Sequence, residues 1–262
     1  MTDTRMASDT AAGPGSPLGE PASGWRRALR RPDVWVPLAL LGVFLVLWAL
    51  VLARPTFLTS FDVRVRDHVQ NTARSDVDGA HRWPLIKSVA DLGGGVTVPG
   101  VPVQIQLPMA AMTVVSLICA AVRRNWRPLA AAAIGFAALG LVLLLKAIGD
   151  RPGPGMAGQA LTDRLGYFPS GHTGNTMIGY GTSALILASV FTGRHARRAI
   201  AAAMTSLALA VGFSLVWMNY HWLSDVLGSY ALCGAALFVV ARVSGTMTTT
   251  TPAGAASSAR SG

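Results

Sequence analysis

The chain has 262 residues, of which 52% are hydrophobic and only 13% are charged. Soluble domains carry about 25% charged residues, so these proportions argue against a water-soluble globule. The 22 Lys and Arg residues outnumber the 12 Asp and Glu residues and give a formal net charge of +10. Because the arginines mostly flank apolar blocks, we expect this charge to face anionic membrane lipids, and we predict no nucleic-acid partner.

The apolar residues gather in six blocks of roughly twenty residues each, the length of a helix that crosses a bilayer core. The blocks lie at about 34–53, 101–122, 129–147, 173–192, 199–219 and 225–243. Each block is predicted to be a helix, because backbone amides in hydrocarbon must find their hydrogen-bond partners within the segment. The sequence thus predicts an all-α polytopic membrane protein with six transmembrane helices.

Polar stretches flank these blocks, and their composition predicts disordered tails at 1–24 and 244–262 around a membrane domain at 25–243. Short connections rich in Lys and Arg stay in the cytoplasm. Such residues precede the first block and fill the connections after the second and fourth: Arg26, Arg27, Arg30, Arg31, Arg123, Arg124, Arg127, Arg194, Arg197 and Arg198. We therefore expect both termini to be cytoplasmic.

The connection between the first two blocks, 54–100, is long, and long connections usually have structure or function of their own. Apolar and polar residues alternate at 61–69, a pattern compatible with an interfacial helix or with a solvated connector. We expect short helices here and a turn at Gly93, Gly94 and Gly95. Two prolines and two glutamines at 102–108 weaken the start of the second block, so its first turns are expected at the interface or kinked.

Three clusters of polar residues lie where apolar blocks end or begin. Lys146 ends the third block and is followed by Arg151-Pro152; the segment 167–172 precedes the fourth block; and 220–225 separates the fifth from the sixth. If each block crosses the membrane once, all three clusters lie on the same membrane face. Ionisable groups beside membrane spans are costly and usually functional, so this face is predicted to hold a site.

The first two clusters suit a phosphate group, whose oxygens bind guanidinium, ammonium and hydroxyl donors. Lys146 and Arg151 supply the cations, and Ser170 and Gly171 precede a helix whose first amides and dipole favour an anion. Taken singly, each has another interpretation. The lysine is also a common interfacial anchor, and Ser170 would suit a hydrolase nucleophile, although the Gly-x-Ser-x-Gly motif is missing.

The third cluster adds a candidate nucleophile. His221 and Asp225 are four residues apart and share a helix face, so the carboxylate can hold one ring nitrogen while the other attacks phosphorus. His172 is then placed to protonate the leaving oxygen. The pair is also compatible with a structural hydrogen bond or half of a metal site, but no third ligand accompanies it, and we predict no metal.

In order and spacing, these residues resemble the type 2 phosphatidic acid phosphatase superfamily, lipid phosphate phosphatases that share a site design with vanadium haloperoxidases. Pro169-Ser170-Gly171-His172 matches the central motif of that family. His221-x-x-x-Asp225 matches the end of its third motif, and Lys146 with Arg151-Pro152 resembles its first. The similarity covers about 140–235 and implies a bundle of six membrane helices with the site at the outer interface.

The resemblance also implies roles for these residues. His221 would form a phosphohistidine, Asp225 would orient it, and His172 would be the general acid. The phosphate oxygens would be held by Lys146, Arg151, Ser170 and the Gly171 amide, and neither metal nor cofactor is required.

Two positions depart from the family pattern. The first-motif arginine usually lies seven residues after the lysine, where this chain has Gly153, and the third motif usually opens with Ser-Arg, where this chain has Ser214-Leu215. Arg164 is a candidate for the compensating charge, as are Arg82 and Lys87 of the long connection.

We therefore expect an integral membrane phosphatase that hydrolyses a lipid phosphate or diphosphate, phosphatidate-like or polyprenyl, at the extracytoplasmic face. Two alternatives stay open. The first is a phosphotransferase that uses an acceptor other than water, and the second is a non-catalytic membrane protein of the same fold that binds lipid.

Overall fold

The computed structural model describes residues 32–75, 83–97, 104–154, 165–191 and 193–246. The predicted tail at 1–24 lies outside the described residues, as does most of the predicted tail at 244–262.

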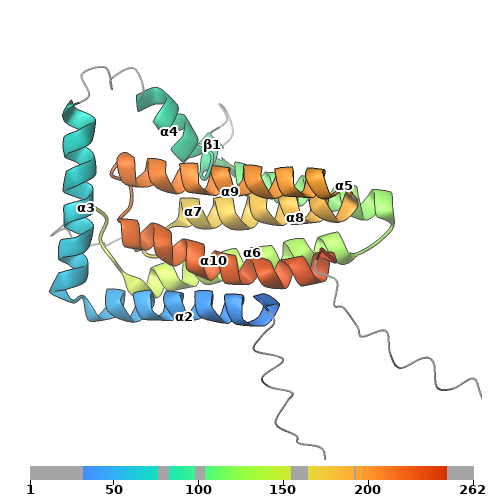
Figure 1. The fold of residues 1–262 in the computed structure, drawn as a ribbon, viewed down its shortest axis with the longest axis horizontal. Coiled ribbons are helices and arrows are strands. Elements are labelled where there is room, and N and C mark those ends of the chain that lie inside the picture. Colours follow the sequence, from blue (N-terminus) through green and yellow to red (C-terminus); the bar gives the residue numbers. More distant parts are fainter. Residues whose placement is uncertain (1–31, 76–82, 98–103, 155–164, 192, 247–262) are drawn as a thin grey trace, which may run out of the picture.

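Apolar helices run side by side, parallel or antiparallel, and form a bundle (Figure 1). They are α2 (Pro32–Ala53), α5 (Leu107–Arg123), α6 (Arg127–Gly149), α9 (Arg194–Trp217), α10 (Leu223–Ser244) and a helical run of α7 (Gly171–Asn175), the π-helix η2 (Thr176–Tyr180) and α8 (Gly181–Val190). Among the described residues, α2, α6, α9 and α10 are each long and apolar enough to cross a membrane. The all-α membrane architecture is confirmed, while the count of six crossings stays a prediction.

Two predicted spans differ from regular single helices. The second begins as a helix at Leu107 rather than near 101, with a proline in its first turn, where a missing amide hydrogen costs nothing. Immediately before it, β2 (Gln104–Gln106) pairs antiparallel with β1 (Gly95–Thr97). The fourth predicted span contains the π-helical segment η2, a feature often found at functional sites.

The long connection contains α3 (Thr56–Ser75) and α4 (Trp83–Asp91), which confirms the expected helices. α3 lies across one end of the bundle, roughly at right angles to the other helices, and α4 packs beside α9 (Figure 1). Leu58 and Asp62 are buried on α3 and Val65 is half-buried. Their spacing places them on one helix face, so α3 covers this end of the bundle with that face.

Phe168 anchors the segment between α6 and α7. Its ring is fully buried and packs on Phe44 and Trp48 of α2, with centroid distances of 6.0 and 5.8 Å. Gly228 of α10 faces the same ring, and a Cβ there would lie 2.5 Å from it. An approach this close between the Phe168 ring and α10 requires glycine, and it fixes the start of α7 between α2 and α10.

Candidate active site

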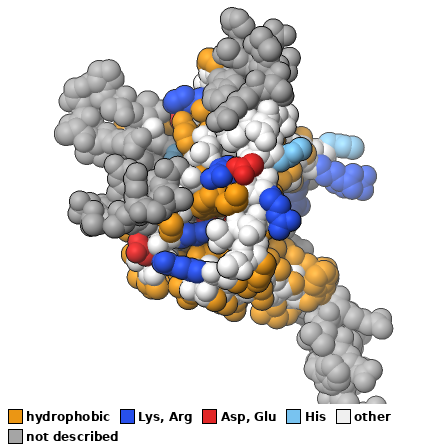
Figure 2. Space-filling model, turned by 90° about the vertical axis from the view of Figure 1, so that its left-hand side faces the viewer, with side chains coloured by type: hydrophobic (Ala, Val, Ile, Leu, Met, Phe, Trp, Pro, Cys, Tyr) orange, Lys and Arg blue, Asp and Glu red, His pale blue; other side chains and the backbone are white. Residues whose placement is uncertain are grey.

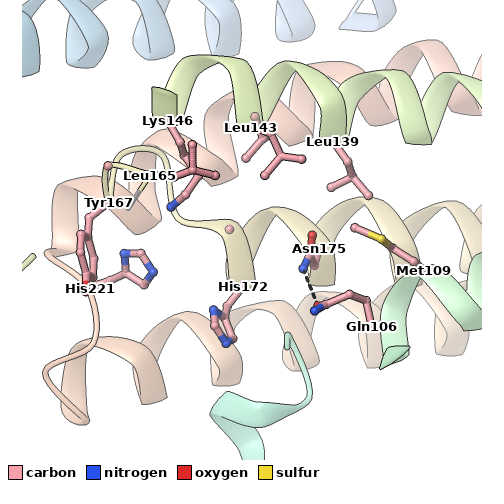
Figure 3. Close-up of a pocket in the computed structure, with 13 residues that line it drawn as sticks. Gln106, Met109, Leu139, Leu143, Lys146, Leu165, Tyr167, His172, Asn175 and His221 are labelled. Carbon is pink, nitrogen blue, oxygen red and sulfur yellow. Dashed lines mark hydrogen bonds between the residues drawn. The ribbon is translucent and has the colours of Figure 1, made fainter. Parts of the chain in front are cut away.

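All three polar clusters lie at the end of the bundle that α3 crosses (Figure 1). Viewed onto this end, Lys and Arg side chains are scattered over the surface, with acidic side chains beside some of them (Figure 2). Lys146 comes from the last turn of α6, His172 from the first turn of α7, and His221 from the segment just before α10. The three side chains converge on a common space (Figure 3).

This space is a cavity of about 460 Å³ with two chemically different ends. Its polar end is lined by Lys146, Tyr167, Gly171, His172 and His221. Its other end is lined by Met109, Leu139 and Leu143, next to the amides of Gln106 and Asn175, which are hydrogen-bonded to each other at 3.3 Å (Figure 3). Leu165 lies beside Lys146 and Tyr167 at the polar end. The cavity thus accommodates a molecule with a polar head and an apolar tail.

His221 is held by the buried carboxylate of Asp225. Its Nδ1 lies 3.3 Å from Asp225 Oδ2, which also accepts the backbone amide of Trp222 at 3.1 Å. The histidine is 7% exposed and the aspartate 0%. A carboxylate at Nδ1 selects the tautomer with the proton on that nitrogen, so Nε2 keeps its lone pair for a reaction in the cavity.

Arg151 lies behind this pair and contacts two carboxylates. Its Nη1 donates to Asp225 Oδ1 and to Ser224 Oγ, both at 2.6 Å, and its Nη2 donates to Asp62 Oδ2, also at 2.6 Å. Neither Arg151 nor Asp62 is among the described residues that line the cavity. The structure therefore places this guanidinium against carboxylates, whereas the sequence analysis expected it against phosphate.

Ser170 and Gly171 begin the fourth predicted span. Ser170 is fully buried as the N-cap, and its Oγ accepts hydrogen bonds from the amide and hydroxyl of Thr173 at 3.3 and 3.1 Å. Its hydroxyl therefore stabilises the helix start, and only Gly171 of the two lines the cavity. The first amides of a helix have no partner within it, so those of Gly171 and His172, which line the cavity, suit an anion.

Lys146 lies beside this helix start. Its Nζ donates to the carbonyl of Pro169 at 3.4 Å and lies 5.9 Å from the ring centre of Tyr167. The Tyr167 ring in turn packs edge-on against His221 at 5.4 Å. Gly153 packs closely against the Tyr167 ring, since a Cβ at this position would lie 2.6 Å from the ring. The glycine at the family's arginine position thus makes room for a tyrosine that packs on the candidate nucleophile.

His172 faces His221 across the polar end, with ring centres 6.4 Å apart. The glycine turn before β1 lies close to the His172 ring: a Cβ added at Gly94 would lie 2.8 Å from His172 Nε2. The hydroxyl of Tyr180 holds this turn by donating to the carbonyl of Leu92 at 3.2 Å. The expected turn therefore also positions the imidazole.

The other candidates for phosphate charge lie elsewhere. Leu215 is fully buried in an apolar cluster with Val211 and Val226, so its position offers no polar contact with the cavity. Lys87 is exposed and bonds to Asp91 at 2.6 Å, a contact that raises the pKa of its ammonium. Arg164 and Arg82 lie outside the described residues.

The sequence analysis missed Asp62, the outer partner of Arg151. One signal for it was present, because Leu58, Asp62, Val65 and Val69 follow a helical period and place a carboxylate on an otherwise apolar face. A charge on such a face needs a buried partner. The distances to Tyr167 and Gly94 had no comparable signal, because they depend on how separate elements pack.

The arrangement has the groups that phosphoryl transfer through histidine requires. It contains an imidazole oriented by a carboxylate, a second imidazole opposite, a lysine, and helix amides around one space. Within the described ranges, no group of three or more His, Cys, Asp or Glu residues is placed to hold a metal ion.

Comparison with known proteins supports the fold. The solved structure of a transmembrane PAP2-type phosphatidylglycerolphosphate phosphatase from Bacillus subtilis matches with a TM-score of 0.66 at 19% identity, covering 83% of this chain and 100% of that one. This likeness shows a shared fold. No curated protein matches the chain. Residues 129–248 match the PAP2 superfamily, and this range contains nearly all of α6, the helices from α7 to α10 and all three motifs.

Proposed function

We propose that the protein is an integral membrane phosphatase that removes phosphate from a lipid phosphate or diphosphate. The observation that carries this proposal is the placement of the His221–Asp225 pair opposite His172, beside Lys146, at the polar end of an amphipathic cavity. The comparisons support a phosphatase fold in a membrane, and the choice of substrate and mechanism rests on the cavity and its side chains.

The apolar end of the cavity favours a lipid substrate. Leu139, Val142 and Leu143 of α6 form one wall, and α6 carries no charged residue from 128 to 145. A phosphate at the polar end would leave its acyl or prenyl chain against these side chains. Burying apolar surface contributes about 25 cal/mol per Å², which a water-soluble phosphate ester without a tail does not gain.

The first chemical step forms a phosphohistidine. Nε2 of His221 attacks phosphorus, the bond from phosphorus to the lipid oxygen breaks, and His172 donates a proton to that oxygen. Asp225 at Nδ1 stabilises the positive charge that the ring acquires. Lys146 and the helix amides of Gly171 and His172 bind the phosphoryl oxygens as their charge redistributes.

The second step releases phosphate. Water gives a proton to the now neutral His172 and attacks phosphorus, and the nitrogen–phosphorus bond breaks, returning the electron pair to Nε2 of His221. Inorganic phosphate leaves and the tautomer held by Asp225 is restored. We place this site at the extracytoplasmic face, with both termini in the cytoplasm, because the most densely basic short connections lie at the opposite end.

The test uses purified protein in detergent micelles with phosphatidate, phosphatidylglycerolphosphate and polyprenyl diphosphate. We expect phosphate release from at least one, an acid-labile phosphoprotein in acid-quenched wild type, and neither in His221→Ala. The matched control is His195→Ala, which should retain wild-type rates. His195 is exposed and lies at the start of α9, whereas the site lies at the other end of that helix.

Equal phosphate release from wild type and His221→Ala would refute the proposal. Turnover that requires an added alcohol and yields a new phosphate ester would replace it with a phosphotransferase. Binding of these lipids without any turnover would replace it with the non-catalytic alternative.

A further inference from the structure

Asp62 is a fully buried carboxylate that lies outside the part of the chain that matches the family. It is 1% exposed, on the face of α3 that packs against the bundle. Its Oδ1 accepts the Ser224 amide at 3.1 Å, and its Oδ2 accepts the Ser224 hydroxyl and Arg151 Nη2, both at 2.6 Å. Burying a carboxylate without hydrogen-bond partners is costly. The contacts of Asp62 therefore hold its carboxylate in one position.

These contacts determine how Arg151 meets Asp225. The guanidinium is planar and rigid, so a carboxylate on Nη2 fixes the direction in which Nη1 points. Nη1 then occupies Oδ1 of Asp225, which leaves Oδ2 for His221. The Trp222 ring also lies under the guanidinium, with the Arg151 Cζ 5.8 Å from its centre, and limits its movement out of this plane.

The charges of Asp62, Arg151 and Asp225 also connect Asp62 with His221. Arg151 with Asp225 alone would form a neutral pair, and the carboxylate would stabilise a positive imidazole only weakly. With Asp62 the group carries two negative charges and one positive, so net negative charge remains behind the ring. Such charge favours the state in which Nε2 of His221 is bonded to phosphorus and the ring is cationic.

We propose that Asp62 is a positioning residue of the phosphatase site, acting through Arg151 on the Asp225 carboxylate and hence on His221. This inference rests on the proposed function. It assigns Arg151 to the support of the nucleophile and gives α3 a role in catalysis as well as in covering the bundle end.

The test compares Asp62→Asn with wild type in turnover of phosphatidate and in inhibition by orthovanadate, an analogue of the five-coordinate transition state. Outer partners of this kind typically change activity by about 10–100-fold, so kcat should fall by that factor with KM within about two-fold. The inhibition constant for vanadate should rise about ten-fold or more. Asp67→Asn is the matched control, because it removes one charge from the same helix at a side chain that is 54% exposed, and it should match wild type in all three values.

The vanadate constant separates positioning from loss of folded protein. A merely structural role lowers the active fraction but leaves the inhibition constant of the remaining molecules unchanged. If Asp62→Asn yields no folded protein, Asp62→Glu keeps the charge and moves the carboxylate, and the same changes in kcat and inhibition constant are expected in smaller degree.

Wild-type kcat and vanadate inhibition in a folded Asp62 variant would overturn the inference and leave the phosphatase proposal intact. Absence of phosphate release from wild type itself would overturn both.

Discussion

Replacing Gly94 by alanine tests whether the glycine turn positions His172. The added Cβ would lie 2.8 Å from His172 Nε2 and 3.0 Å from its Cδ2. Non-bonded heavy atoms sit about 3.5 Å apart or more, so the ring must move by at least about half an ångström. The φ angle of Gly94 is one that alanine can adopt, so the substitution acts through this contact rather than through backbone strain.

A displacement of this size is large for a proton donor. General acid catalysis contributes about 10²–10⁴-fold, and a misplacement of about 1 Å can cost about 10²-fold. We expect kcat of Gly94→Ala on phosphatidate to fall by about 10–100-fold. Because His172 protonates the leaving oxygen, an aryl phosphate ester with a more acidic leaving group should lose less activity than the lipid ester.

The assay is phosphate release from both substrates, with thermal unfolding measured on the same preparations. Gly140→Ala in α6 is the control, because no atom lies within 4 Å of its added Cβ, and it should keep wild-type kcat. An unchanged kcat for Gly94→Ala on the lipid ester would refute the positioning of His172 by this turn. Equal losses on the two substrates would instead refute its role as general acid.

Other substitutions test the remaining parts of the site and the fold. Lys146→Met removes the cation at the helix start and should lower kcat by about 10²–10³-fold in the same assay, and a loss below about three-fold would exclude contact with phosphate. Leu215→Arg buries an unpaired charge at a fully buried position and should lower the unfolding free energy by about 3 kcal/mol or more, whereas a stable variant with raised kcat would show that this position reaches the substrate. Phe168→Ala should cost about 3–5 kcal/mol in denaturant unfolding, and a cost under about 1 kcal/mol would contradict its anchoring role. For orientation, an impermeant maleimide added to intact cells should label Thr59→Cys and not His195→Cys, and the reverse pattern would invert the topology.

The membrane architecture and the candidate residues of the cavity were accessible from the sequence. Hydrophobicity and helix length are local properties, so long apolar blocks predicted helices such as α6 and α10 within a few residues of their observed ends. The structure likewise brings Lys146, His172 and His221 to one end of the bundle, the arrangement expected from the order of the spans. The start of α5 was less predictable, because prolines and glutamines between 102 and 108 suit an interface, a kink or a strand.

The alternatives for Arg151 and Ser170 needed the tertiary structure. Each carries donors suited to phosphate, and the sequence alone favours that role. Arg151 instead contacts Asp62, which is 89 residues away in the chain. The Ser170 hydroxyl is used by the helix that it caps. A side chain with several possible partners binds whichever one packing brings within reach, and that depends on the placement of α3.

The amino-acid sequence by itself thus determined a bundle of apolar helices and the polar residues at its end, because both follow from periodicity and from motifs within short segments. Only the tertiary structure decided which charged residues form pairs. It also decided that a carboxylate of α3 contacts the arginine that supports the nucleophile, and that a glycine turn lies close to His172. These are contacts between elements far apart in the chain, and their geometry is set by the packing of whole helices rather than by any local pattern.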